Sequence, residues 1–297
     1  MSKTIVITGA TGNVGKLLAE SLLGRGLEVR VVGREAHRLA GLVARGAEAH
    51  VGDLADVSFL KSVFAGADAA YLMIPPNYTV EDFRGYQHGI AAAFREALAA
   101  TGVPRAVSLS SVGAHLAAGN GPIAGLHRLE QELDAVPGLH RVHLRPAYFF
   151  ENHLFSVDLI RHAGINGSTA RGDVAIPMVA TRDIADVAAE ILAASDFTGR
   201  TVRYILGPED LSMAAATTIL GAAIDRPHLA YVQFPEDEAR KSMAGIMSAA
   251  LMEDYLEMNR GFSDGAVAAT EPRSAANSSP TSLATWAREV FAPAFGG

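Results

Sequence analysis

The amino-acid sequence predicts an α/β protein with a doubly wound parallel sheet and a smaller, mainly helical C-terminal lobe. Two observations lead to this fold class. Short apolar runs rich in β-branched residues alternate with segments of helical apolar spacing through the first half of the chain, as is typical of parallel sheets covered by helices on both faces. Beyond about residue 150 the alternation becomes irregular and helical spacing dominates.

The first strand, turn and helix predict a phosphate site. Residues 4–7 (TIVI) are typical of a buried strand, and residues 16–23 show helical spacing. The glycines between them follow the spacing G-x-x-G-x-x-G, which differs from the commoner G-x-G-x-x-G. A turn of this kind at a helix N-terminus presents backbone N–H groups to a pyrophosphate. We therefore expect a dinucleotide-binding Rossmann domain whose diphosphate contacts are Gly9, Thr11, Gly12, Asn13, Val14 and Gly15.

The later elements of this domain follow at short intervals. We expect further strands at residues 28–32, 47–51, 69–74, 106–109 and 140–144, and helices at 36–46, 57–64, 82–101 and 126–136. Ligands bind at the carboxyl ends of the strands in such sheets, so these ends should carry the site. Residues 1–150 are assigned to this cofactor domain.

Residues 151–297 are assigned to a smaller substrate-side lobe, with segments at about 180–207 returning to the Rossmann domain. The expected elements are a helix at 182–194, a strand at 201–206, a helix capped by Ser212 and one long helical stretch at 236–260. Residues 164–172 are expected to be irregular, and residues 263–282 are rich in Ala, Ser, Thr and Pro.

Composition excludes several classes of function. A net charge of −7 argues against nucleic acid as a partner, and the absence of cysteine excludes disulfides, thiolate metal sites and a cysteine nucleophile. The ten histidines lack any H-E-x-x-H spacing, so no metal is expected. No apolar run of about 18 residues is present, and residues 1–15 do not resemble a signal peptide. We expect a soluble cytoplasmic protein that does not contact membranes.

The end of the second strand favours NADPH over NADH. Dinucleotide folds usually place a carboxylate there to bind the adenosine ribose, whereas this chain has Gly33-Arg34, followed by Arg38 one helical turn later. Guanidinium groups pair with phosphate in a bidentate manner, so Arg34 and Arg38 predict a site for the 2′-phosphate. The alternative is that Arg34 is an ordinary solvated surface residue.

Residues at the ends of the later strands are expected to line the rest of the cofactor path. Asp53 could receive the adenine amino group, or it could simply form the turn in the segment GDLAD. The other predicted cofactor contacts are Leu54, Met73, Ile74, Pro75, Ser110, Ser111, Pro146, Tyr148 and Phe149.

Taken together, these motifs resemble the NmrA-like family, atypical members of the short-chain dehydrogenase/reductase superfamily. The segments that carry the likeness are GATGNVG at 9–15, Arg34, SSVGA at 110–114, LRP at 144–146, FEN at 150–152, RDIA at 182–185, GP at 207–208 and Ser212. They cover most of residues 1–215. The closest likeness is to the NADPH-dependent quinone oxidoreductases of that family, in which a histidine occupies the position of His127.

The chain departs from the superfamily at the catalytic pair. Typical short-chain reductases use Tyr-x-x-x-Lys on the helix before the sixth strand, and counting back from Arg145 places Ile123 and His127 at those positions. Isoleucine cannot transfer a proton, so the usual carbonyl-reduction mechanism is not encoded unless another acid substitutes. His127 could hold the ribose hydroxyls or donate a proton, or it could be a surface residue of an amphipathic helix.

The segment after the sixth strand predicts a flat substrate. Tyr148, Phe149 and Phe150 could stack on a conjugated ring, although one of the two phenylalanines is expected in the core. Tyr148 is also a candidate proton donor. Further candidate substrate contacts are Val112, Asn152, Met243 and Met247. The two methionines could instead belong to ordinary core.

Three functions follow from these residues. The first is an NADPH-dependent oxidoreductase that transfers hydride to a quinone or similar conjugated acceptor, which needs no protein acid. The second is a non-catalytic NADP(H) sensor that acts through a protein partner, favoured by the missing Tyr and Lys. The third is an imine or alkene reductase of a biosynthetic pathway. The sequence leaves the oligomeric state open, with a homodimer among the alternatives.

Overall fold

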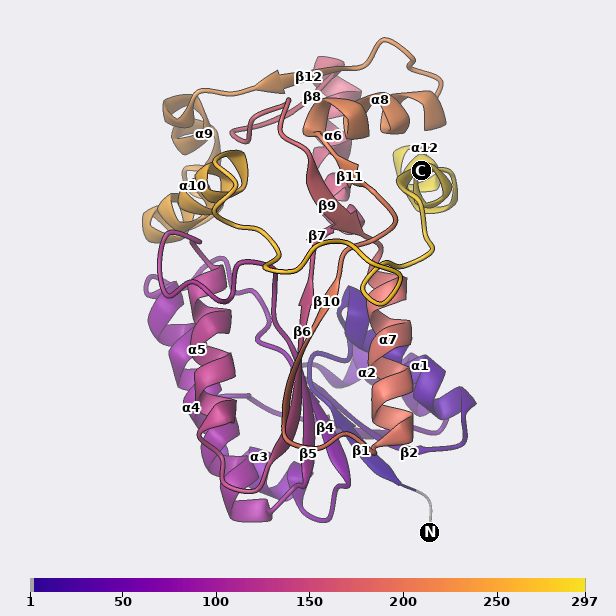
Figure 1. Ribbon diagram of the computed structural model, residues 1–297, viewed down its shortest axis with the longest axis vertical. Coiled ribbons are helices and arrows are strands. Elements are labelled where there is room, and N and C mark those ends of the chain that lie inside the picture. Colours follow the sequence, from indigo (N-terminus) through magenta and orange to yellow (C-terminus); the bar gives the residue numbers. More distant parts are fainter. Residues whose placement is uncertain (1–2, 297) are drawn as a thin grey trace.

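The computed structural model describes residues 3–296 and has a parallel sheet at its centre (Figure 1). The sheet has seven strands in the order β10-β6-β5-β4-β1-β2-β3, and every pair is parallel. The predicted doubly wound fold class is therefore confirmed. The strands are β1 (Thr4–Ile7), β2 (Glu28–Gly33), β3 (Glu48–Val51), β4 (Ala69–Leu72), β5 (Arg105–Leu109), β6 (His140–Pro146) and β10 (Arg200–Ile205).

Alternating side chains of the strands feed two hydrophobic cores, one on each face of the sheet. In β1, Ile5 and Ile7 enter one core and Val6 enters the other, all three without solvent exposure, because successive strand residues point to opposite faces. Three helices cover each face (Figure 1). They are α1 (Asn13–Gly24), α2 (Ala36–Val43) and α7 (Thr181–Ala194) on one face, and α3 (Val57–Phe64), α4 (Phe83–Thr101) and α5 (Ile123–Asp134) on the other.

The second lobe lies beyond the carboxyl ends of the strands (Figure 1). It contains two small sheets, with the strand orders β11-β9-β7 and β12-β8. Its strands are β7 (Tyr148–Phe149), β8 (Ile165–Ser168), β9 (Ile176–Val179), β11 (Asp210–Leu211) and β12 (Ala230–Gln233). Its helices are η1 (Phe150–Ser156), α6 (Val157–Ala163), α8 (Met213–Ala223), α9 (Glu236–Met243) and α10 (Ala249–Ser263).

After α10 the chain crosses back over the middle of the molecule, as the yellow segment in Figure 1 shows. Leu206 N–H donates to the Asn277 carbonyl oxygen at 2.7 Å, and the Thr281 hydroxyl donates to Asp183 at 2.6 Å. The segment ends in α11 (Leu283–Trp286), the π-helical turn η2 (Ala287–Phe291) and α12 (Ala292–Gly296). It thereby joins α7 and the end of β10 to the upper lobe.

Two predicted elements differ from the structure. The single helix expected at 236–260 is broken, because α9 ends at Met243 and α10 begins at Ala249, where the Ser248 hydroxyl accepts from Leu251 N–H. Gly245 lies in the break with φ +83°, a conformation that glycine adopts at little cost. Residues 164–172, expected to be irregular, contain β8, which pairs with β12 about 65 residues later.

Within residues 3–296, no helix is long and apolar enough to cross a membrane.

Candidate cofactor and substrate site

The glycine turn between β1 and α1 has the geometry that a diphosphate requires. Gly9 has φ +65°, and a Cβ on Gly15 would collide with the Gly9 carbonyl oxygen, so both positions need glycine. Gly12 precedes α1, and no side chain of the described part of the chain caps this helix. The N–H groups of its first turn are thus left for an anion, where the helix dipole also favours negative charge. The turn fits the diphosphate of a dinucleotide.

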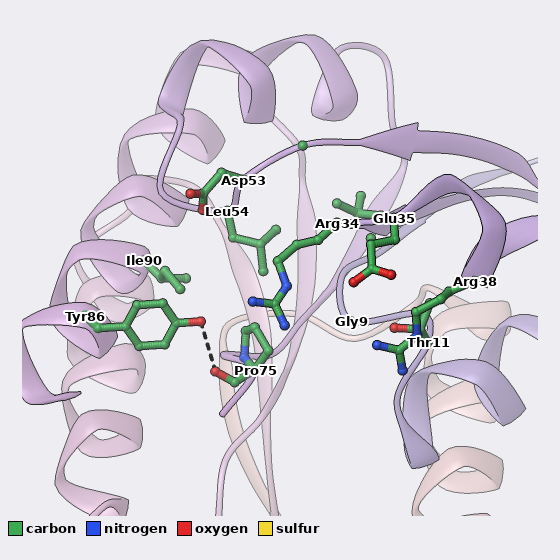
Figure 2. A pocket seen from close by; sticks show the side chains of 13 residues that line it. Gly9, Thr11, Arg34, Glu35, Arg38, Asp53, Leu54, Pro75, Tyr86 and Ile90 are labelled. Carbon is green, nitrogen blue, oxygen red and sulfur yellow. Dashed lines mark hydrogen bonds between the residues drawn. The ribbon is translucent and has the colours of Figure 1, made fainter. Parts of the chain in front are cut away.

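A shallow pocket follows at the carboxyl ends of β2 and β3 (Figure 2). It is lined by the glycine turn, both predicted arginines and the loop after β3, namely Gly9, Thr11, Val32, Gly33, Arg34, Glu35, Arg38, Gly52, Asp53, Leu54, Pro75, Tyr86 and Ile90. Figure 2 shows the Arg34 guanidinium directed between Leu54 and Pro75, with Arg38 beside Thr11. Apart from the Glu35 and Asp53 carboxylates, the lining carries no negative charge from the residues described.

Neither Arg34 nor Arg38 forms an ion pair with any described carboxylate, which leaves both guanidinium groups available to a ligand. Glu35 lines the same pocket and reduces its positive charge, and no sequence signal had drawn attention to it. Asp53 Oδ1 accepts from Ala55 N–H at 2.9 Å, which is the turn-forming contact of the alternative interpretation. Tyr86 was also missed; its hydroxyl donates to the Pro75 carbonyl oxygen at 3.0 Å (Figure 2).

A larger cavity of about 520 Å³ lies between the sheet edge and the upper lobe, within the usual size range of small-molecule sites. The sheet domain contributes Met73, Ile74, Tyr78, Phe83, Ser110 and Ser111, and β7 and η1 of the second lobe contribute Tyr148, Phe149, Asn152 and His153. The opposite wall comes from β12 and α10 and includes Tyr231, Tyr255, Met258, Asn259 and Phe262. The lining is therefore rich in aromatic side chains from both lobes.

Besides His127 and the glycine-turn residues Gly12, Asn13, Val14 and Gly15, five predicted substrate or cofactor contacts lie outside both cavities. Phe150 packs against Trp286 with ring centroids 5.8 Å apart, so it is the core member of the phenylalanine pair, whereas Phe149 lines the cavity. Val112 and Pro146 are buried beside each other through a backbone hydrogen bond of 3.0 Å. The remaining residues are Met243 and Met247.

Met243 and Met247 do not line the larger cavity because the helix predicted to carry them is broken. Because the helix breaks at Gly245, Met243 belongs to α9 and Met247 to the connecting segment, and only α10 continues along the cavity. Met258 and Phe262, one turn apart on α10, form the wall that the sequence had assigned to the earlier methionines.

The two residues predicted at the positions of the conventional Tyr-Lys pair occupy different surroundings. Ile123 lines the larger cavity with its aliphatic side chain. His127 is half-buried one turn later and donates from Nδ1 to the Ala114 carbonyl oxygen at 2.8 Å, and it lines neither cavity. The structure thus anchors His127 to the loop after β5.

Ser110 faces the cavity from β5, but its hydroxyl is already engaged. It donates to Glu130 Oε1 at 2.6 Å, and Glu130 is held by Arg145 through bonds of 2.6 and 2.9 Å. Arg145 also donates to the Tyr204 hydroxyl at 3.0 Å. This buried pair connects α5 to β6. The Ser110 hydroxyl therefore belongs to a hydrogen-bond network that stabilises the fold. A buried glutamate on an amphipathic helix carries no distinct sequence signal.

The ionisable groups of the larger cavity are uncharged near neutral pH. Burial lowers the pKa of His153 to about 4, and this side chain packs against the Tyr148 ring at 5.6 Å. Burial raises the pKa of Tyr148, which stays protonated. Neither group has a pKa near 7, the condition for efficient acid–base catalysis at that pH. The cavity can orient and desolvate a ligand but offers no matched proton donor.

Ser108 of β5, His143 of β6 and Asp134 of α5 also lie within hydrogen-bonding distance in a row. His143 Nδ1 lies 2.7 Å from the Ser108 hydroxyl, and its Nε2 lies 3.0 Å from Asp134. Ser108 is 1% exposed and lines neither cavity, so no substrate reaches this arrangement. Among residues 3–296 no group of three or more His, Asp or Glu side chains could hold a metal ion.

Comparison with known proteins identifies an NAD(P)H-binding family. The family model described as NAD(P)H-binding matches residues 9–195. The NAD(P)H azoreductase of Xenophilus azovorans is 27% identical over 244 residues, which cover 82% of this chain and 81% of the azoreductase.

Two solved structures share the fold. The NADPH-dependent quinone oxidoreductase of Escherichia coli in complex with NADPH has a TM-score of 0.79 at 21% identity, covering 97% of this chain and 99% of that one. NmrA, a negative transcriptional regulator in complex with NADP, has a TM-score of 0.67 at 18% identity, covering 98% and 95%. The predicted resemblance is therefore confirmed. Because the family model spans more than half of the sequence, the protein belongs to the NAD(P)H-binding family and has the fold of its NmrA-like, atypical short-chain reductase members.

Proposed function

We propose that this protein is an NADPH-dependent oxidoreductase that reduces a quinone or a similar flat, conjugated acceptor. The observation that carries the proposal is the aromatic cavity of about 520 Å³, which lies on the same sheet edge as the glycine turn. When bound, NADPH would supply a hydride to an acceptor in this cavity. The azoreductase and the quinone oxidoreductase described above are named for acceptors of the same conjugated kind.

The cofactor preference rests on the smaller pocket. Arg34 and Arg38 would hold the 2′-phosphate of NADPH, since guanidinium groups pair strongly with phosphate. The glycine turn and the first turn of α1 would hold the diphosphate. Residues 1–150 would thus act as the cofactor lobe and residues 151–297 as the substrate-side lobe, with α7 and β10 completing the sheet.

The cavity residues would position the acceptor. Phe149, Tyr148 and Phe262 offer ring surfaces on which a flat molecule can pack. The proton that completes reduction of a quinone would come from water, because quinone oxygens accept protons from solvent and the cavity has no acid matched to neutral pH. An ordinary ketone would lack this route, which favours quinones over simple carbonyl substrates.

A second candidate is an NADP(H) sensor of the NmrA kind that acts through a protein partner. The observation in its favour is Ile123, which lines the cavity where the superfamily has its catalytic tyrosine. The size and aromatic lining of the cavity favour the oxidoreductase instead, because a sensor has no need of a substrate site.

The deciding experiment follows NADPH oxidation with quinones, enones, imines and azo dyes, and repeats each assay with NADH. We expect turnover of quinones, with NADPH preferred. Calorimetry measures NADPH binding in parallel. Tight NADPH binding without reduction of any acceptor would reject the oxidoreductase and leave the sensor, whereas turnover confined to imines or enones would select the biosynthetic reductase.

A further inference from the structure

The larger cavity has a lining without formal charge. Among the described residues that form it there is no aspartate, glutamate, lysine or arginine, although the chain as a whole carries a net charge of −7. The charged side chains nearby are paired outside the lining. Arg84 meets Asp254 at 2.7 Å, and Glu130 is held by the buried Arg145. A charged ligand entering this cavity would leave water without gaining an opposite charge.

Most polar side chains of the lining already have partners within the protein. Tyr231 donates its hydroxyl to the Ala170 carbonyl oxygen at 2.7 Å, and the amide nitrogens of Asn166 and Asn259 donate to threonine hydroxyls at 2.8 and 2.7 Å. Ser110 donates to Glu130. These groups stabilise the walls and are less available to a ligand.

Among the buried side-chain nitrogen and oxygen atoms of the described lining, Nε2 of His153 is the exception. The His153 side chain is 4% exposed and lines the cavity, yet Nε2 has no hydrogen-bond partner among residues 3–296. The other buried side-chain atoms left unpartnered belong to residues outside this lining, namely His50, Tyr71, Asn120 and Ser279. A buried polar atom without a partner is destabilising, and such exceptions in folded proteins call for a ligand or water.

We propose that the cavity selects acceptors without formal charge, and that His153 is the positioning residue that hydrogen-bonds their oxygen or nitrogen atom. This inference rests on the proposed function and narrows its substrate class to neutral conjugated molecules. Sulfonated or carboxylated acceptors are excluded because no cation in the lining compensates them. Cationic acceptors are excluded because no carboxylate in the described lining compensates them.

The first test compares a neutral acceptor with an anionic acceptor that has the same ring system. We expect 1,4-naphthoquinone to be reduced with a kcat/KM about 100-fold higher than its 2-sulfonate. The sulfonate withdraws electrons and makes the ring easier to reduce, so slower turnover reports exclusion from the cavity. Equal or faster turnover of the sulfonate would overturn the inference and leave the oxidoreductase proposal intact.

Binding without turnover separates the two proposals. Calorimetry on the complex with NADP⁺ compares the same two quinones. If no acceptor is reduced but the neutral quinone binds and the sulfonate does not, the oxidoreductase proposal fails and the selectivity stands. If neither quinone binds, or both bind equally, the selectivity is wrong.

The second test replaces the imidazole. His153→Phe keeps a ring of similar size without a hydrogen-bonding atom, and we expect about a tenfold rise in KM for the neutral quinone with kcat and NADPH affinity nearly unchanged. His153→Gln restores a hydrogen-bonding amide and should recover most of the affinity. The matched control is His162→Phe, because His162 lies exposed on α6, where its Nδ1 donates to the Asp158 carbonyl oxygen of the same helix. An unchanged KM in His153→Phe would remove His153 from the proposal.

Discussion

Arg34 and Arg38 supply the positive charge of the smaller pocket, at the carboxyl ends of β2 and β3. They supply two guanidinium groups against the carboxylates of Glu35 and Asp53, of which Asp53 is engaged with the Ala55 N–H. A cofactor phosphate placed beside Arg34 would gain charge-assisted hydrogen bonds that a ribose hydroxyl cannot match. In the proposed function, discrimination between the two nicotinamide cofactors would thus depend on a few atoms at the end of β2.

Arg34→Ala should therefore raise the KM for NADPH roughly 10- to 100-fold and leave the KM for NADH nearly unchanged, because a hydrogen bond to a charged group contributes about 1.5–3 kcal/mol. Steady-state kinetics with both cofactors measures the effect. Arg45→Ala is the control, since Arg45 forms only a surface ion pair with Glu20 at 3.6 Å. Equal losses with NADPH and NADH would show that Arg34 does not contact the 2′-phosphate.

His153 should make the fold sensitive to acid. Burial lowers its pKa to about 4, against 6.5 in the unfolded chain, so the unfolded chain binds more protons at pH values between these two. Stability is therefore fully present above pH 6.5 and decreases as the pH falls toward 4, by roughly 2–3 kcal/mol at pH 4.5.

Urea unfolding at pH 7 and pH 4.5 tests this contribution. The stability lost between the two pH values should be smaller in His153→Phe than in the wild type by that amount. His162→Phe should lose as much as the wild type, since its side chain is exposed. An identical loss in all three proteins would mean that His153 becomes charged without penalty.

At the scale of elements, the turn between β1 and α1 tolerates no side chain at two of its glycines. Gly15 lies in the first turn of α1 and faces the backbone of Gly9, whereas Gly24 at the end of the same helix has no atom within 4 Å of a Cβ position. The helix can approach the strand closely only because this contact is made by glycine. The same close approach sets the position of the N–H groups that would meet the diphosphate.

Gly15→Ala is expected to destabilise the protein by about 1–3 kcal/mol and to weaken NADPH binding, because α1 must move away from β1. Gly24→Ala should be neutral or stabilise by up to about 1 kcal/mol, as alanine favours a helix. Chemical denaturation and calorimetry measure the two properties. A Gly15→Ala protein with unchanged stability and unchanged affinity would exclude a tight strand-to-helix contact here.

At the scale of the whole molecule, the two lobes share one core. A single hydrophobic cluster includes Ile5 of β1, Met178 of β9 and Trp286 of α11. Trp286 is the only tryptophan of the chain, packs against Phe150 at 5.8 Å and donates from Nε1 to Glu151 at 3.0 Å. The C-terminal segment is thus part of the structure that holds the upper lobe over the sheet.

Because the core is shared, the lobes should unfold together. We expect tryptophan fluorescence, which reports on the C-terminal segment, and far-UV circular dichroism, which reports on all helices, to give the same urea midpoint. Trp286→Phe identifies the fluorescence signal and should lower stability by about 1–3 kcal/mol, since it leaves the half-buried Glu151 with one bond fewer. A fluorescence transition at lower urea would indicate a separately unfolding C-terminal segment.

The positions of the strands and helices along the chain follow from short stretches of sequence. The alternation of apolar runs placed all seven strands of the central sheet within a few residues, and Ser212 was identified as the cap of α8, where its hydroxyl accepts from Ala215 N–H. The break between α9 and α10 was missed although Gly245 and Ser248 both mark it. The strand β8 was missed because INGS has little β propensity and is paired only with the distant β12.

By itself the sequence determined the fold class, the glycine turn and the two arginines after β2, and it predicted that Ile123 and His127 stand at the positions of the conventional catalytic pair. The glycine turn and the arginines are local motifs, and the fold class follows from the alternation of such local patterns along the chain. Only the tertiary structure decided that Phe149 rather than Phe150 lines the cavity, that Glu130 engages Ser110 and that His153 lies buried and unpartnered beside the walls from α10. Those features depend on contacts between distant segments, some of them more than 100 residues apart in the chain. Burial by these contacts sets the charge and the hydrogen bonding of a side chain, and such contacts leave no local pattern in the sequence.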